Sequence, residues 1–334
     1  MGFSRVGAIT LASGENYLYS AGIDQPNGFA YFGSFTIPGR LTKVQLSDFT
    51  RVGAITLPTG ENKLTSVLID QPNGFAYCTA RNTFQCLIKI RLSDLARIDK
   101  GNFTGEGGYL NSGVIDLPGG FAYFGIDVAP GRIFKVNFLS LTQVGGLVFE
   151  DPENYLCFPV IDQPNGFAYF GTFTIPGRVV KIRLSDYTRV GAITLEDGEN
   201  KPRSAVIDQP NGFAYFGTAT APGKVVKIRL SDFTRVGAIT LESGESNLYS
   251  AVIDQPNGFA YFGTATIPGR VVRIRLSDFT RVGAITLESG ENNLYSAVID
   301  QPNRSAYFGT YTIPARVIKI KWGGRQMLSV MGMQ

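Results

Sequence analysis

Residues 247–292 read NLYSAVIDQPNGFAYFGTATIPGRVVRIRLSDFTRVGAITLESGEN, and similar copies of this stretch fill the chain. The dipeptide Ile-Asp marks each copy and recurs every 46 residues, at Ile23-Asp24, Ile69-Asp70, Ile115-Asp116, Ile161-Asp162, Ile207-Asp208, Ile253-Asp254 and Ile299-Asp300. Seven units of 46 residues make 322 of the 334 residues, so the sequence is one repeat array without room for a second domain. We therefore assign residues 1–324 to a single domain and residues 325–334 to a C-terminal tail.

Each unit contains four short segments rich in Val, Ile, Tyr, Phe and Thr, separated by clusters of Gly, Pro, Asn, Asp and Ser. This pattern is typical of strands joined by turns. In the quoted copy we expect strands at about Leu248–Asp254, Phe259–Thr266, Arg270–Ser277 and Arg281–Leu287. The apolar residues lack the i, i+3, i+4 spacing of an amphipathic helix, so we expect an all-β protein.

Four antiparallel strands in each of seven units predict a seven-bladed β-propeller. A β-solenoid is the alternative, but its coils are usually shorter and need no fixed number of copies. Tyr follows Ala at one position of every unit, namely at Tyr31, Tyr77, Tyr123, Tyr169, Tyr215, Tyr261 and Tyr307. A large residue beside a small one at fixed positions lets neighbouring sheets interdigitate, which favours blade-on-blade packing.

The start of the chain matches the last strand of a unit, because Phe3–Leu11 aligns with Phe49–Leu57 at a shift of 46 residues. The last unit supplies only three strands before the match ends. We therefore expect Arg5–Leu11 to pair with Arg316–Lys321 and to close the ring, since this pairing covers two open strand edges. The C-terminal tail is the poorer candidate for that place, because Gly323-Gly324 replaces the usual Ser-Asp turn.

Composition and charge exclude several classes of function. The sequence is 44% hydrophobic and 17% charged, which suits a folded protein, and its net charge of +4 is too small to indicate a nucleic-acid partner. The absence of histidine excludes His-dependent catalytic triads and His-bearing metal sites. No apolar run approaches the length of a membrane span or a signal peptide. We expect a monomer without metal, cofactor or membrane span.

The segments VIDQPNGFAYFGT (residues 206–218) and VVKIRLSDFTRVGAITL (residues 225–241) resemble the repeat of YVTN-type β-propellers. The shared features are a hydrophobic strand, an Asp-Pro-x-Gly-like turn, a Tyr-containing strand and a final strand–turn–strand. The unit departs from the family in its length and in Phe-Gly-Thr, which stands where the family has Val-Thr-Asn. The resemblance covers residues 3–324 and implies a binding or scaffold protein, often secreted or at the cell surface, with no catalytic residue carried over.

Three sets of repeated polar residues are candidates for either binding or structure. An Asp ends each first strand, where it could bind a cation but is better placed to cap the following turn; this set is Asp24, Asp70, Asp116, Asp162, Asp208, Asp254 and Asp300. Charged residues in two loops form either a polar rim for a charged or sugar ligand or solvated ion pairs; these are Glu15, Glu61, Glu153, Glu199, Glu245 and Glu291 with Arg40, Arg132, Arg178, Lys224, Arg270 and Arg316. The third strands carry cations that need an acidic partner if they lie between blades; these are Lys43, Lys89, Lys135, Lys181, Lys227, Arg273 and Lys319.

One sector, about residues 78–160, departs from the repeat. A binding site on one side of the ring requires such asymmetry, although sequence drift in a repeat array also produces it. The candidate binding residues of this sector are Arg81, Asn82, Asp99, Lys100, Tyr109, Asp127, Glu150 and Asp151. Cys78 and Cys86 flank a predicted hairpin turn in the same sector, where they either form a disulfide or remain two buried thiols.

These observations favour a non-catalytic propeller that serves as a binding or scaffold module for a protein or a glycan. The repeat shows no set of residues with matched acid, base and nucleophile roles. The alternative is a hydrolase or lyase that uses carboxylates at the central channel, because the fold alone does not decide function. An enzyme is expected to place unlike polar residues at the axis, whereas the predicted axial strand is mostly Ser, Ala, Val and Ile.

Overall fold

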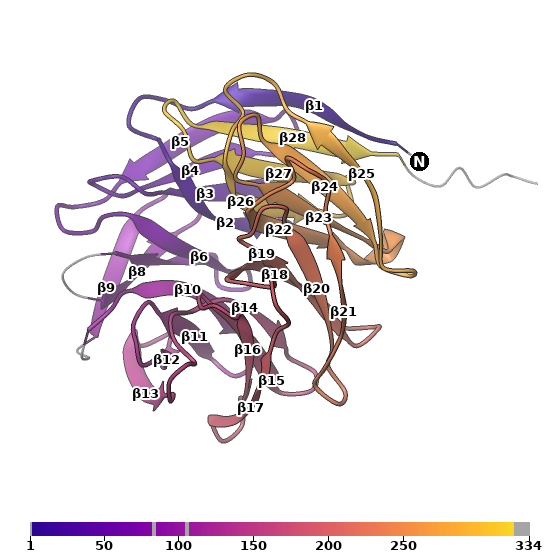
Figure 1. Ribbon diagram of the computed structural model, residues 1–334. Coiled ribbons are helices and arrows are strands. Elements are labelled where there is room, and N and C mark those ends of the chain that lie inside the picture. Colours follow the sequence, from indigo (N-terminus) through magenta and orange to yellow (C-terminus); the bar gives the residue numbers. More distant parts are fainter. Residues whose placement is uncertain (1, 82–84, 104–106, 324–334) are drawn as a thin grey trace, which may run out of the picture.

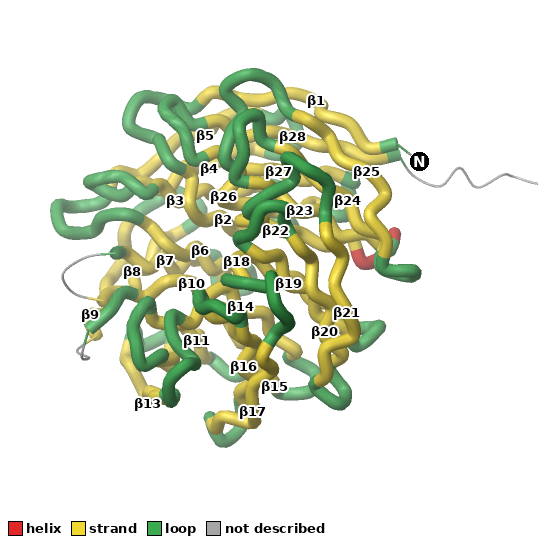
Figure 2. Tube along the Cα trace, in the orientation of Figure 1, coloured by secondary structure: helices red, strands yellow, loops and turns green. Residues whose placement is uncertain are grey.

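The computed structural model describes residues 2–81, 85–103 and 107–323. Its strands form seven antiparallel sheets of four strands, arranged as blades around a central axis (Figure 1). In the described part of the chain the only helical element is a 3-10 turn at Gln255–Asn257 (Figure 2). The predicted seven-bladed all-β propeller is therefore confirmed.

The first strand of each blade lies at the axis and the fourth at the periphery (Figure 1). Blade one contains β2 (Leu18–Asp24), β3 (Phe29–Ser34), β4 (Arg40–Gln45) and β5 (Thr50–Thr56). Blade two contains β6 (Leu64–Asp70), β7 (Phe75–Ala80), β8 (Gln85–Arg91) and β9 (Arg97–Phe103). Blade three contains β10 (Leu110–Asp116), β11 (Phe121–Ile126), β12 (Arg132–Asn137) and β13 (Thr142–Val148). Blade four contains β14 (Leu156–Asp162), β15 (Phe167–Thr172), β16 (Arg178–Arg183) and β17 (Thr188–Thr194).

The remaining three blades repeat the same order. Blade five contains β18 (Pro202–Asp208), β19 (Phe213–Thr218), β20 (Lys224–Arg229) and β21 (Thr234–Thr240). Blade six contains β22 (Leu248–Asp254), β23 (Phe259–Thr264), β24 (Arg270–Arg275) and β25 (Thr280–Thr286). Blade seven contains β26 (Leu294–Asp300), β27 (Ser305–Thr310), β28 (Arg316–Trp322) and, as its outer strand, β1 (Phe3–Thr10).

The first strand of blade six has the predicted bounds, but the second strand ends two residues earlier than expected. β23 ends at Thr264 because its hydroxyl hydrogen-bonds to the hydroxyl of Thr266 at 2.6 Å and accepts from the Arg270 N–H at 2.8 Å. These side-chain hydrogen bonds satisfy polar groups of the turn, which therefore do not pair in the strand ladder. The third strand likewise stops at Arg275, which forms an ion pair with Asp278 across the next turn at 2.8 Å.

The predicted closure of the ring is confirmed. β1 runs antiparallel to β28, with Phe3 opposite Trp322. The ring of Phe3 lies 5.7 Å from that of Tyr261 in blade six, and the equivalent contact between Phe49 and Tyr307 measures 5.5 Å. The N-terminal strand thus makes the inter-blade packing that the fourth strands make elsewhere. The predicted tail, residues 325–334, lies outside the described residues.

Candidate functional site

The Asp residues at the ends of the first strands face their own turns. Asp208 and Asp254 are at most 2% exposed. In six blades the carboxylate accepts hydrogen bonds from the Asn three residues later, as from Asn211 Nδ2 to Asp208 at 2.9 and 3.1 Å. In blade three, where Gly119 replaces that Asn, Asp116 accepts from the Gly119 N–H at 3.2 Å. These contacts are those of turn-capping residues.

The loop Glu residues are buried, so neither a ligand-binding rim nor solvated ion pairs describes them. Glu15 is 1% exposed and Glu245 is fully buried. Each of the six accepts hydrogen bonds from an Arg on the outer strand of the blade that follows the loop, as Arg281 Nε donates to Glu245 at 2.8 Å. Two parallel guanidinium hydrogen bonds offset the desolvation of the carboxylate. Four of the cations that begin the third strands donate instead to carbonyls of the preceding loop, as Arg316 Nη1 donates to the Ser289 carbonyl at 2.9 Å; these are Arg40, Lys224, Arg270 and Arg316.

The cations of the third strands lie over aromatic rings, and the turn Asp of the same blade also attracts several of them, as Asp24 attracts Lys43. Lys43 Nζ lies 4.0 Å from the ring centre of Phe29 and donates to the Leu92 carbonyl at 2.8 Å. Blade seven has Ser305 at the Phe position, and there the ring nearest to Lys319 is 5.4 Å away. The face of an aromatic ring attracts a cation without burying a second charge, so the ring supplements the turn Asp as a partner.

Of the eight candidates in the irregular sector, the structure brings three together. Arg81 Nη2 lies 3.2 Å from Asp127 Oδ2, and the Arg81 guanidinium carbon lies 4.5 Å from the ring centre of Tyr109. These residues come from blades two and three and lie on the face where the first strands begin.

Four of the other candidates lie elsewhere. Asp99 and Lys100 are on the outer strand β9, where Lys100 pairs with a loop glutamate at 3.6 Å. Glu150 and Asp151 are in the loop after β13. Asn82 lies outside the described residues. The irregular sector is therefore not one site.

None of the three cysteines forms a disulfide, and all three are buried. In the ladder between β7 and β8, Cys86 lies opposite Ala80 and Cys78 lies opposite Ile88, so the two do not face each other. The buried-thiol alternative is therefore correct for this pair. Burial also raises the pKa of Cys157 to about 12.

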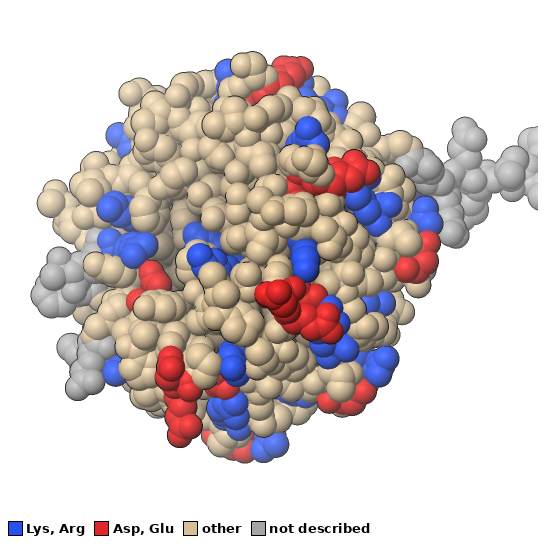
Figure 3. Space-filling view, viewed as in Figure 1, with Lys and Arg blue, Asp and Glu red and all other residues tan. Residues whose placement is uncertain are grey.

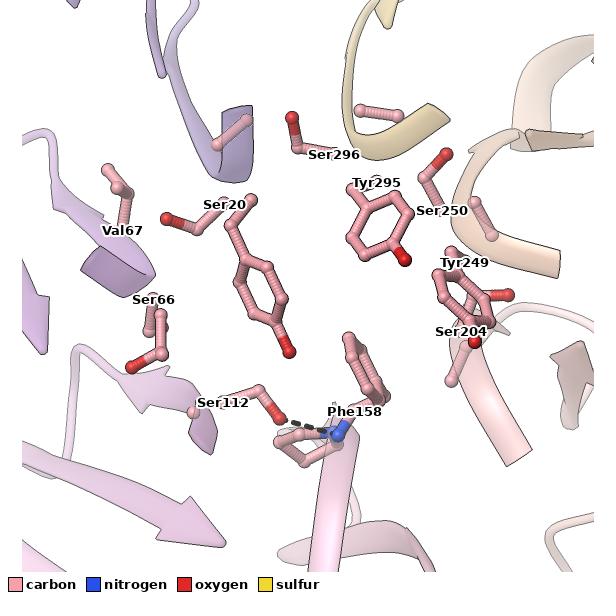
Figure 4. Close-up of a pocket in the computed structure, with 18 of the residues that line it drawn as sticks. Ser20, Ser66, Val67, Ser112, Phe158, Ser204, Tyr249, Ser250, Tyr295 and Ser296 are labelled. Atoms are coloured by element: carbon pink, nitrogen blue, oxygen red, sulfur yellow. Dashed lines mark hydrogen bonds between the residues drawn. The ribbon is translucent and has the colours of Figure 1, made fainter. Parts of the chain in front are cut away.

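The first strands of the seven blades surround a cavity of about 200 Å³ on the axis (Figure 4). Its wall is made of Ser, Ala and aromatic side chains, and the described residues that line it include no carboxylate. The rings of Phe158 and Tyr295 project into the open middle (Figure 4). Because the cavity is smaller than the roughly 300–1,000 Å³ of typical ligand pockets, only part of a ligand would enter it.

The serines in this wall mainly hold neighbouring blades together. Ser250 Oγ donates to the Leu294 carbonyl of the next blade at 2.9 Å, and Ser296 Oγ donates to the Leu18 carbonyl across the ring closure at 3.0 Å. Phe158 replaces the serine in blade four, and its N–H donates to Ser112 Oγ at 2.5 Å. The chemistry available to a ligand therefore depends more on the residues around the mouth of the cavity.

Three repeat positions surround this mouth, and all three vary between otherwise similar blades. The first holds Tyr17, Lys63, Tyr109, Tyr155, Lys201, Asn247 and Asn293. The second holds Tyr19, Thr65, Asn111, Cys157, Arg203, Tyr249 and Tyr295. The third holds Phe35, Arg81, Asp127, Phe173, Ala219, Ala265 and Tyr311. We call these residues the axial mouth; the Ile-Asp at the other end of the same strands does not vary at all.

Blades six, seven and one give the axial mouth an aromatic half. Tyr295 and Tyr311 stack with their ring centres 4.4 Å apart and their planes at 20°. Tyr249 meets Tyr295 edge to face at 4.7 Å, and Tyr19 packs on Phe35 at 5.0 Å. All five side chains are half-buried, so part of each ring remains accessible. The result is a continuous aromatic surface at one side of the cavity.

Blades two, three and five give the axial mouth a charged half, which contains four cations and one acid: Lys63, Arg81, Lys201, Arg203 and Asp127. In the space-filling view, Lys and Arg side chains lie beside a hollow near the middle of the ring (Figure 3). Arg203 connects the two halves, because its Nη2 donates to Tyr19 Oη at 3.1 Å and its guanidinium lies 4.7 Å from the ring of Tyr249. Burial raises the pKa of the Tyr19 hydroxyl, with Arg203 opposing the change.

Sequence reasoning found Arg81, Tyr109 and Asp127 but missed most of the axial mouth. The missed residues, such as Arg203 and Tyr295, belong to blades that look regular as a whole. The available signal was the variation at single repeat positions among near-identical copies, rather than the irregularity of one sector.

No protein-family model matches this sequence, and no curated protein matches it. The resemblance to YVTN-type propellers therefore rests on the repeat motif alone. No helix of the described chain is long and apolar enough to span a bilayer. The described residues also contain no group of three or more Cys, Asp or Glu residues that could hold a metal ion.

Proposed function

We propose that this protein is a non-catalytic binding module that holds a glycan at the axial mouth. The observation that carries the proposal is the accessible aromatic surface of Tyr249, Tyr295 and Tyr311 beside polar and cationic groups. A sugar ring offers C–H faces that pack on aromatic rings and hydroxyls that bond to polar side chains, and sites for such ligands combine these two kinds of contact.

The enzyme alternative receives less support. A hydrolase or lyase of the kind considered needs carboxylates near the central channel. The single acid at the three positions of the axial mouth is Asp127, and Arg81 holds it at 3.2 Å. The charge distribution thus favours binding over acid–base catalysis.

A protein partner is the second candidate, because the same face carries exposed apolar side chains. Ile37, Ile175, Ile267 and Ile313 are 64–79% exposed in the loops between second and third strands. Exposed apolar residues that recur around one face are typical of protein-binding surfaces.

Two substitutions that copy residues from other blades separate these candidates. Tyr311→Ala reproduces Ala265 of blade six, and Ile267→Ala reproduces Ala221 of blade five, so both variants should fold. On a glycan array, wild-type protein should bind. Tyr311→Ala should weaken that binding about 3- to 10-fold, because one aromatic contact contributes about that much to affinity. Ile267→Ala should leave the binding unchanged.

Two results would count against the glycan proposal. One is an array without any binding. The other is glycan binding that survives Tyr311→Ala unchanged, which would place the ligand away from the axial mouth. Capture of a protein partner that depends on Ile267 would instead support the second candidate.

A further inference from the structure

Arg203 differs from the other paired arginines of this protein. On the outer strands, Arg residues pair with buried Glu, and at the mouth itself Arg81 pairs with Asp127. Within the described chain, no Asp or Glu lies within ion-pair distance of Arg203, whose one hydrogen bond goes to Tyr19 Oη. A guanidinium has five N–H donors, so most of its bonding capacity is unused.

The fold does not require a cation at this place. The other six blades have Tyr, Thr, Asn or Cys at the same repeat position. Arg203 lies among aromatic rings, with its guanidinium carbon 5.0 Å from the ring centre of Phe173 and 5.3 Å from that of Phe158, and its Nε is buried without a partner. The aromatic rings attract the positive charge but accept no hydrogen bonds in the plane of the guanidinium, so its remaining N–H donors suit a ligand that supplies an anion.

We propose that Arg203 binds the carboxylate of an acidic sugar whose ring packs on the aromatic half of the axial mouth. This inference rests on the proposed glycan-binding function and specifies the class of glycan. The planar guanidinium matches a carboxylate in two-point hydrogen bonding. Lys201, two residues before Arg203 in blade five, also lies over the ring of Phe173 and adds positive potential beside Arg203, which favours an anion.

The distances fit a carboxylate attached directly to a sugar ring. Tyr249 touches both parts of the site, because its ring lies 4.7 Å from the Arg203 guanidinium and 4.7 Å from the ring of Tyr295. A uronic acid places its carboxylate one bond from the ring, so both groups can be engaged at once. Tyr19 Oη accepts from Arg203, which leaves its own proton free to be donated to the same carboxylate.

A matched pair of ligands tests this assignment. Methyl β-D-glucuronide and methyl β-D-glucoside differ only in a carboxylate in place of a hydroxymethyl group. By titration calorimetry, wild-type protein should bind the glucuronide about tenfold more tightly, which is the low end for hydrogen bonds to a charged group. Arg203→Thr, which copies Thr65 of blade two, should remove the preference, so that the variant binds the two ligands with equal affinity.

A second variant and a change of salt keep the test decisive if Arg203→Thr fails to fold. Arg203→Lys should keep part of the preference, because it retains the charge but loses the two-point geometry. Higher ionic strength should weaken binding of the glucuronide and leave that of the glucoside unchanged.

Equal affinity of wild-type protein for the two ligands, or a preference that persists in Arg203→Thr, would overturn the assignment. If both ligands bind equally and Tyr311→Ala weakens both, the glycan-binding proposal stands and only the role of Arg203 is wrong. If neither ligand binds although the array shows glycan binding that depends on Tyr311, only the acidic-sugar assignment fails; if the array shows no binding either, both proposals fail.

Discussion

Blade three shows that the two partners of a buried ion pair are kept or lost together. At the position of the loop Glu it has Gly107, and at the position of the outer-strand Arg it has Gln143. Losing the Arg alone would leave a buried carboxylate without its donors, which costs more than losing both. The paired loss within one chain therefore supports a structural role for the other six pairs.

We expect Glu15→Gln and Arg51→Gln each to lower the free energy of unfolding by about 2 kcal/mol, because each leaves a partner of the pair without its ion. Glu15 is 1% exposed, and Arg51 Nε donates to it at 2.8 Å. The double variant should lose clearly less than the sum of the two single losses, as in blade three. Urea denaturation measures all three, and additive losses would show that the two residues do not act as a pair.

Among the strands, β1 is important for the stability of the ring because it joins the two ends of the chain. It supplies the outer edge of blade seven, and Phe3, Ile9 and Leu11 pack into the clusters on either side. Burying a side chain of this size stabilises a protein by about 1.5–3 kcal/mol. Deletion of residues 1–11 should therefore cost about 5 kcal/mol and expose β28 as an open edge that promotes association.

Thermal denaturation and light scattering of this deletion variant measure both effects. A synthetic peptide of residues 2–11, added in excess, should restore part of the lost stability by occupying the vacant edge. Deletion of residues 326–334 is the matched control and should change little. Equal tolerance of the two deletions would contradict the assigned role of β1.

The strands illustrate what the sequence can and cannot predict. The turn residues and the spacing of Ile-Asp predict the blades because strand pairing within a blade is local in sequence. The C-terminal end of β23 was misplaced because threonine hydroxyls, rather than the strand ladder, hydrogen-bond the turn. The partner of Glu15 was missed because contact with Arg51 depends on how the outer strand crosses the preceding loop, which periodicity does not specify.

For the whole molecule, the axial mouth was the part least accessible to sequence reasoning. Tyr19 and Tyr311 are 292 residues apart and become neighbours, with ring centres 6.4 Å apart, only because the ring closes. Position-by-position comparison of the seven blades identifies which residues vary. Only the closed structure shows that these residues face one another across the axis.

We expect the repeated tyrosines to make the whole ring sensitive to alkaline pH. Burial raises the pKa of all seven above the ordinary value of about 10, so they stay protonated in the folded state while the unfolded chain releases their protons. Their contribution is complete below pH 10 and is lost as the pH rises further. Burial lowers the pKa of Lys43, Lys181, Lys227 and Lys319, which has the opposite sign: it costs stability at neutral pH, and this cost is relieved as the pH rises to about 10.5.

The urea midpoint should therefore hold steady or rise toward pH 10 and then fall steeply. Each tyrosine proton contributes about 1.4 kcal/mol per pH unit, so seven together would remove about 10 kcal/mol by pH 11. Tyr169→Phe isolates one of them, because Tyr169 Oη has no hydrogen-bond partner in the described structure and its loss should leave stability at pH 7 intact. Above pH 10 the stability of the variant should fall less steeply with pH, because six rather than seven tyrosines release a proton on unfolding. A decline of unchanged slope, or tyrosinate absorbance that appears before unfolding, would mean that these hydroxyls ionise inside the folded ring.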